Sequence, residues 1–84
     1  MKYNFYLIGG KIMKMRTERK DGVVISTVRP MFLAWYGNYE TAVSIDGEPW
    51  RILEGYETAK QAIEGHKKYE NMSKDELLEF DYIG

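Results

Sequence analysis

The chain has 84 residues, which is room for one domain with a small core. Apolar residues make up 44 % and aromatic residues 14 % of it, a composition typical of a folded globular protein and not of a disordered one. The absence of cysteine excludes disulfides and thiolate metal sites and favours a reducing compartment such as the cytosol. No apolar run approaches the ~20 residues of a membrane span, and the short run near the N-terminus is too brief for the core of a signal peptide. We expect a single domain over residues 1–84 that needs neither a membrane nor a cofactor.

The net charge of −1 conceals an uneven distribution of charge along the chain. Residues 1–30 hold seven Lys or Arg against two acids, whereas residues 70–84 hold one Lys against five acids. Such asymmetry is typical of a surface that binds nucleic acid or a charged protein. The alternative is that the two ends neutralise each other, within the fold or across a homo-oligomer.

The N-terminal half predicts a series of antiparallel hairpins. A two-glycine turn joins predicted strands over residues 3–8 and 11–19. Asp21-Gly22 closes a second hairpin onto a strand over residues 23–29, and Pro30, which cannot donate to a ladder, separates this strand from another over residues 31–36. The second strand should have one buried and one charged face, because Met13, Met15 and Thr17 alternate with Lys14, Arg16 and Glu18.

Asp46-Gly47 is the strongest hairpin signal, because both central residues of a type I′ turn need a positive φ angle. It joins a strand over residues 39–45 to one that begins near Pro49, and a proline there indicates an edge strand. A two-residue loop predicts three cross-strand pairs, Ile45 with Glu48, Val43 with Trp50 and Thr41 with Ile52.

Two capping boxes predict helices, Thr58 with Gln61 and Ser73 with Glu76. The first helix carries an apolar stripe that should lie on the sheet, formed by Ala59, Ala62, Ile63, His66 and Tyr69. The second helix is short and close to the C-terminus. The predicted fold is therefore α+β, an antiparallel sheet of about five to six hairpin strands with one main helix packed on one face and a short C-terminal helix.

His66 is the only histidine, and a lone histidine cannot build a three-ligand zinc site without carboxylates. No pattern for a nucleophile or a phosphate loop accompanies it. We interpret His66 as a packed structural residue and expect no catalytic and no metal-binding residues. Gly65 beside it costs about 1 kcal/mol in a helix interior, which predicts that the helix backbone closely approaches the sheet.

Two sets of residues are candidates for binding a partner protein. The first is aromatic and flanks the turn at Gly37, where the alternative is core packing under the helix: Trp35, Tyr36 and Tyr39. The second is the acidic tail, which could imitate nucleic acid toward a basic protein: Glu70, Asp75, Glu76, Glu79 and Asp81. A free edge on the strand after Pro49 could also pair with a strand of the partner.

A third set is a candidate for nucleic-acid binding through the basic hairpin, and it consists of Lys14, Arg16, Arg19 and Lys20. Phosphate contacts need several cations that point outward from one element. Glu18 and Asp21 dilute the positive charge here, so an ordinary solvated strand face is the alternative.

Residues 39–69 carry a recognisable pattern, Tyr39-Glu40-Thr41, Asp46-Gly47, Trp50, Tyr56-Glu57-Thr58, Ala62 and Gly65-His66. The pattern resembles a family of small proteins from tailed phages and prophages. This resemblance supplies no catalytic residues; it implies an origin in a phage genome and action inside the infected cell or in the virion. We therefore expect a non-enzymatic phage accessory protein in the host cytoplasm that binds a host protein, as an inhibitor of a host enzyme or defence system. The alternatives are a nucleic-acid-binding module and a small virion or assembly protein.

Overall fold

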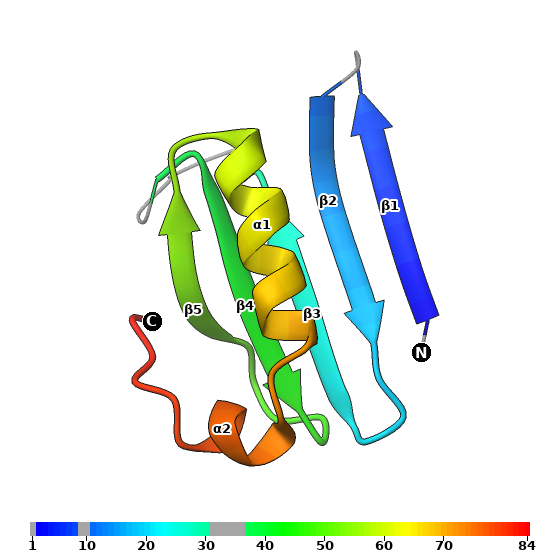
Figure 1. The fold of residues 1–84 in the computed structure, drawn as a ribbon, viewed down its shortest axis with the longest axis vertical. Coiled ribbons are helices and arrows are strands. Elements are labelled where there is room, and N and C mark those ends of the chain that lie inside the picture. Colours follow the sequence, from blue (N-terminus) through cyan, green and yellow to red (C-terminus); the bar gives the residue numbers. More distant parts are fainter. Residues whose placement is uncertain (1, 9–10, 31–36) are drawn as a thin grey trace.

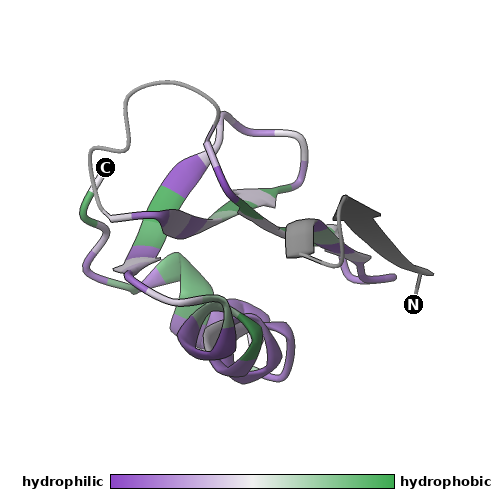
Figure 2. Cartoon of the chain, turned by 90° about the horizontal axis from the view of Figure 1, so that it is seen from above, coloured by the Kyte–Doolittle hydropathy of each residue, from purple (hydrophilic) through white to green (hydrophobic). Residues whose placement is uncertain are grey.

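The computed structural model of the chain describes residues 2–8, 11–30 and 37–84, with side chains from residue 14 onward. Five strands form one antiparallel sheet in chain order: β1 (Lys2–Ile8), β2 (Lys11–Glu18), β3 (Val23–Val28), β4 (Tyr39–Ile45) and β5 (Arg51–Tyr56). Helices α1 (Ala59–Glu70) and α2 (Lys74–Leu78) follow them and lie on one side of the sheet (Figures 1 and 2). The predicted α+β class, with one main helix on one face and a short C-terminal helix, is confirmed. The strand predicted over residues 31–36 lies outside the described residues.

The two described hairpin turns have the backbone that their sequences predict. Between β2 and β3, Gly22 has a φ of 88° and the Arg19 amide donates to the Val23 carbonyl at 2.8 Å. Between β4 and β5, Asp46 has a φ of 52° and Gly47 a φ of 79°, as a type I′ turn requires. The sequence signal was therefore correct for each turn.

The predicted register between β4 and β5 is wrong, although the turn beside it is right. Val43 lies opposite Arg51 and not opposite Trp50, and Thr41 lies opposite Glu54 and not opposite Ile52. Strand pairing does not resume directly after the turn, because β5 begins only at Arg51, and a bulge between Thr41 and Ala42 shifts the register once more. As a result, Trp50 has no place in the ladder and its side chain is 47 % exposed.

The prediction of an edge strand is confirmed, because β5 is the last strand of the sheet. Its outer side is nevertheless partly paired with the chain's own C-terminus, which runs beside β5 (Figure 1). The Ile52 amide donates to the Gly84 carbonyl and the Ile83 amide donates to the Ile52 carbonyl, each at 3.0 Å. At Ile52, therefore, the edge that we expected to be open to a partner's strand is already occupied.

Both capping boxes are present. At the start of α1 the backbone amide of Gln61 donates to the Thr58 hydroxyl at 3.2 Å. At the start of α2 the backbone amide of Glu76 donates to the Ser73 hydroxyl at 3.1 Å. The α1 stripe buries its central side chains against the sheet, and α1 contacts β2, β3, β4 and β5. None of the described helices is long and apolar enough to cross a membrane.

The core lies between the helices and one face of the sheet. The period of two along β4 places alternate side chains inside, and α1 and α2 contribute one large side chain each. The main cluster of buried side chains consists of Val23, Ile25, Val43, Ile45, Leu53, Tyr69 and Leu77. This packing fixes α2 and the segment after it at one end of the sheet (Figure 1).

Candidate functional site

Most of the predicted acidic tail is on the surface. Four of its carboxylates are exposed on α2 and on the segment that follows it, and we call these the acidic surface: Asp75, Glu76, Glu79 and Asp81. Asp75 and Glu76 lie in the first turn of α2, where negative charge is favourable because of the helix dipole. Asp75 and Glu76 therefore stabilise α2, and all four carboxylates still present charge to solvent.

The remaining protein-binding candidates are placed differently. Glu70 is turned inward, with only 14 % of its side chain exposed, and its carboxylate accepts a hydrogen bond from the Thr17 hydroxyl at 2.7 Å. Tyr39 is buried in a small cluster with Tyr56 and Ala62, which is the core-packing alternative for this residue. Trp35 and Tyr36 lie outside the described residues.

The basic candidates do not form one surface. Arg16 pairs with Glu18 at 3.0 Å and lies over the Trp50 ring at 5.7 Å. Arg16 and Lys14 border the same hollow on the sheet face opposite α1, and Lys20 is exposed in the turn after β2. Arg19 faces the other way and belongs to a structural contact.

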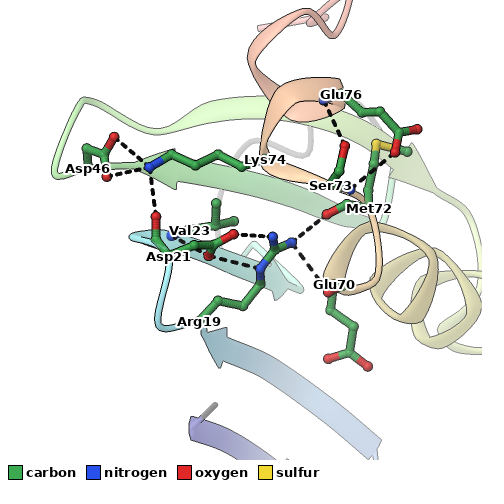
Figure 3. Close-up of polar contacts among 9 residues, drawn as sticks. All are labelled: Arg19, Asp21, Val23, Asp46, Glu70, Met72, Ser73, Lys74 and Glu76. Atoms are coloured by element: carbon green, nitrogen blue, oxygen red, sulfur yellow. Dashed lines mark hydrogen bonds and ion pairs between the residues drawn. The ribbon is translucent and has the colours of Figure 1, made fainter.

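Arg19 joins the β2–β3 turn to the region between the two helices, as Figure 3 shows. Its guanidinium donates to the Met72 carbonyl at 2.5 Å and forms an ion pair with Asp21, and this pairing holds the pKa of the Asp21 carboxyl below its usual range. Lys74 lies beside it and donates to the Asp21 carbonyl at 2.7 Å and to the Asp46 carboxylate at 3.0 Å. Both cations thus hold separate parts of the chain together.

His66 is completely buried between α1 and the sheet, within a row of polar side chains from five elements. Its Nε2 lies 2.9 Å from the Thr17 hydroxyl and its Nδ1 lies 2.7 Å from the Thr27 hydroxyl. The row continues on both sides, and we call it the His66 network: Glu70, Thr17, His66, Thr27, Thr41 and Tyr56. The sequence did not predict this network, although threonines at buried positions of three neighbouring strands were its signal.

The donors and acceptors of the His66 network follow from the Glu70 end of the network and from the neutral state of His66. The Thr17 hydroxyl donates to the Glu70 carboxylate, so its oxygen accepts a hydrogen bond from His66 Nε2–H. In a neutral imidazole with its proton on Nε2, Nδ1 accepts, so Thr27 donates to Nδ1 and accepts from Thr41, which accepts from the Tyr56 hydroxyl at 3.0 Å. All hydrogen bonds then run in one direction, from Tyr56 to Glu70, around a neutral imidazole that carries its proton on Nε2.

The surroundings of the network favour this neutral state. Burial lowers the pKa of the His66 imidazole below its ordinary value of 6.5, and the Glu70 carboxylate, whose Oε2 lies 3.8 Å from Nε2, opposes the shift. Burial also raises the pKa of the Tyr56 phenol above its ordinary value. With no measurable exposure, His66 is enclosed by its hydrogen-bond partners and cannot meet a substrate in this conformation. The arrangement docks α1 on the sheet.

Gly65 allows the α1 backbone to pack directly against the Tyr56 side chain. The sequence predicted such a close approach of the helix to the sheet from the cost of a mid-helix glycine. A Cβ atom at Gly65 would lie 2.1 Å from the Tyr56 hydroxyl and 2.3 Å from Cζ of the same ring. The helix backbone therefore rests directly on the Tyr56 side chain. A larger residue would separate them.

An apolar feature that the sequence analysis missed lies next to the acidic surface. Leu78 is 56 % exposed, and it borders a hollow of about 420 Å³ between α2 and the β4–β5 turn. The lining is largely apolar and consists of Val43, Ile45, Asp46, Glu48, Pro49, Arg51, Leu78 and Tyr82. Two consecutive leucines in a short helix were the signal, since both cannot face the core.

Among the residues that the structure describes, no group of three His, Cys, Asp or Glu side chains is arranged to hold a metal ion.

The chain matches no protein-family model, no curated protein and no solved structure in the comparisons made. The resemblance of residues 39–69 to a phage family therefore stays a prediction.

Proposed function

We propose that the protein is a phage-encoded accessory protein that binds a host protein stoichiometrically and inhibits a host enzyme or defence system. The observation that carries this proposal is the acidic surface on α2 and the following segment, with an exposed leucine in its midst. Lys74, the only cation among residues 70–84, is bound to Asp46, so its charge does not neutralise the four carboxylates of the acidic surface. A basic partner surface is the complement of this arrangement.

The position of His66 also favours binding over catalysis. The single histidine is held by two threonine hydroxyls inside the fold. Binding would then use surface charge and apolar contact, which a small rigid domain can present without chemistry of its own.

Nucleic-acid binding by the basic hairpin is the weaker alternative. One of its four cations, Arg19, is used to hold the helices to the β2–β3 turn, and a second, Arg16, is paired with Glu18. Lys14 and Lys20 remain on different parts of the surface. A phosphate backbone would thus meet only scattered charges.

The proposal is tested by retaining host proteins on the tagged chain from bacterial lysate, in parallel with and without nuclease treatment. The variant is the double substitution Glu79→Lys and Asp81→Lys, and the matched control reverses two exposed charges at and just before α1, with Glu57→Lys and Glu64→Lys. Circular dichroism first establishes that the variant and the control are both folded. We expect one host protein to be retained at equal stoichiometry by the parent chain and the control, and lost with the variant.

Three other results would contradict the proposal. Recovery of nucleic acid alone, lost as salt is raised, would favour the basic hairpin. A discrete multimer in sedimentation with no host protein retained would favour an assembly protein. Equal retention by the variant and the parent chain would remove the acidic surface from the interaction.

A further inference from the structure

The side chain of Leu78 is directed outward by the helix geometry of α2. Consecutive residues of an α-helix are about 100° apart around the axis. Leu77 is fully buried in the core cluster, so its neighbour Leu78 must leave the core, and 56 % of its side chain is exposed. Few large apolar side chains among the described residues are as exposed, and such exposure at a hollow is typical of a contact site.

The hollow beside Leu78 is apolar and is formed without a partner. Its floor includes Val43 and Ile45 of β4, which are 1 % and 8 % exposed and belong to the core. Tyr82 forms part of the opposite wall, and its hydroxyl donates to the Leu77 carbonyl, which ties the wall to α2. A volume of about 420 Å³ lies within the range of about 300–1,000 Å³ found for ligand pockets. The site therefore needs little reorganisation to accept an apolar side chain.

Carboxylates outnumber cations around the hollow once the acidic surface beside it is included. Glu48 and Asp46 line it from the β4–β5 turn, and Glu79 follows Leu78 directly in the chain. One cation, Arg51, lines the hollow with its guanidinium over the Tyr82 ring at 4.1 Å, and a second, Lys74, is held by Asp46 at 2.9 Å. An apolar group that enters the hollow would therefore be flanked by carboxylates that favour Lys or Arg on either side of it.

We propose that the hollow between α2 and the β4–β5 turn binds an apolar side chain of a basic, amphipathic segment of the partner protein, with Leu78 as the contact on this chain. This inference rests on the proposed function and specifies its partner. The partner segment contributes an aliphatic or aromatic anchor to the hollow and places Lys or Arg against Glu48 and Glu79. Charge selects and orients the segment, and the apolar anchor slows its release.

The test uses the full chain, isotope-labelled for NMR, and three synthetic peptides of equal length. The first has leucine and lysine at amphipathic helical spacing, the second has lysine alone, and the third has leucine with glutamate. We expect the first peptide to produce saturable shifts at Leu78, Tyr82 and Val43. The lysine peptide should bind at least tenfold more weakly, and the glutamate peptide should not bind.

Two variants make the assignment specific. Leu78→Ser should weaken binding of the leucine–lysine peptide at least tenfold without unfolding the chain, because the leucine is exposed. Trp50→Ser is the matched control, since Trp50 is 47 % exposed but lies at a different hollow, on the opposite face of the sheet. This variant should bind the leucine–lysine peptide as the parent chain does.

Several results would overturn the inference. These are equal binding by Leu78→Ser, equal binding of all three peptides, or shifts confined to other residues. A dimer of the free chain that dissociates in Leu78→Ser would assign the hollow to a second copy of this chain. If host-protein retention survives Leu78→Ser but is lost with Glu79→Lys and Asp81→Lys, the proposed function stands and the inference about the hollow fails.

Discussion

Replacing Gly65 by alanine adds one methyl group with two opposed effects on stability, a gain in helix preference and a clash with Tyr56. Alanine is favoured over glycine in a helix interior by about 1 kcal/mol, so a freely exposed position would gain stability from this change. At Gly65, however, the new Cβ would meet the hydroxyl, Cζ and Cε1 of Tyr56 at 2.1, 2.3 and 2.4 Å. Ordinary van der Waals contact starts near 3.4 Å, so the helix and the ring must separate by about 1 Å.

The Tyr56 ring has little freedom to retreat. It is 7 % exposed, it packs in a cluster with Tyr39 and Ala62, and its hydroxyl is bound to Thr41. Overpacking of this kind costs about 1–3 kcal/mol, and a lost hydrogen bond of the network adds about 1 kcal/mol. After the helix gain is subtracted, we expect Gly65→Ala to lower the free energy of unfolding by about 2 kcal/mol.

Urea unfolding followed by circular dichroism measures this change, and a second background isolates its cause. With the ring shortened in Tyr56→Leu, the clash is gone and only the helix preference remains. Adding Gly65→Ala there should raise the free energy of unfolding by up to about 1 kcal/mol, so the sign reverses. The reasoning is refuted if Gly65→Ala leaves the parent chain as stable as before, or if its effect is the same in both backgrounds.

Three further predictions concern the contacts that hold the helices to the sheet. Thr27→Val keeps the shape of the side chain but removes the hydroxyl that donates to His66 Nδ1, and it should lower the free energy of unfolding by about 1–3 kcal/mol in urea titrations. Thr27→Ser, which keeps the hydroxyl, should lose less, and the reverse order would contradict the donor assignment. Because the folded pKa of His66 lies below its unfolded value of about 6.5, the unfolded chain takes up the proton first. The stability from this residue is complete above pH 6.5 and is lost as pH falls toward the folded pKa; an NMR titration that places the imidazole pKa above 6.5 would exclude this. Arg19→Met retains the apolar stem but removes the donor to the Met72 carbonyl, and it should cost about 1–3 kcal/mol, whereas Lys20→Met in the same turn should change stability by less than about 0.5 kcal/mol. Equal effects of the two substitutions would show that the Arg19 contact carries no stability.

The sequence by itself determined the local elements of this protein. The capping residues Thr58 and Ser73 begin the two helices, and Asp46-Gly47 supplies the two positive φ angles of its turn. These features depend on residues within about four positions of one another, so they can be read without knowledge of the rest of the chain. The cost of Gly65 likewise indicated that something must lie close to the helix there.

Tertiary structure alone decided which side chains meet over long separations. The hydrogen bond from Thr17 to Glu70 spans 53 positions, and neither residue type indicates the other. The bulge beside Thr41 shifted β4 against β5, because cross-strand packing over the whole face outweighs the loop length that the turn suggests.

The same distinction separates the candidate binding residues. Sequence indicated an acidic C-terminus, but it could not tell that Glu70 would turn inward to Thr17 while Glu79 stays in solvent. Nor could it tell that Leu77 would enter the core and leave Leu78 at a hollow, since the two residues are identical in type and adjacent. The direction that α2 takes against the sheet decides between them, and that direction is set by contacts with β4 and the C-terminal segment, which bring together residues far apart in the chain.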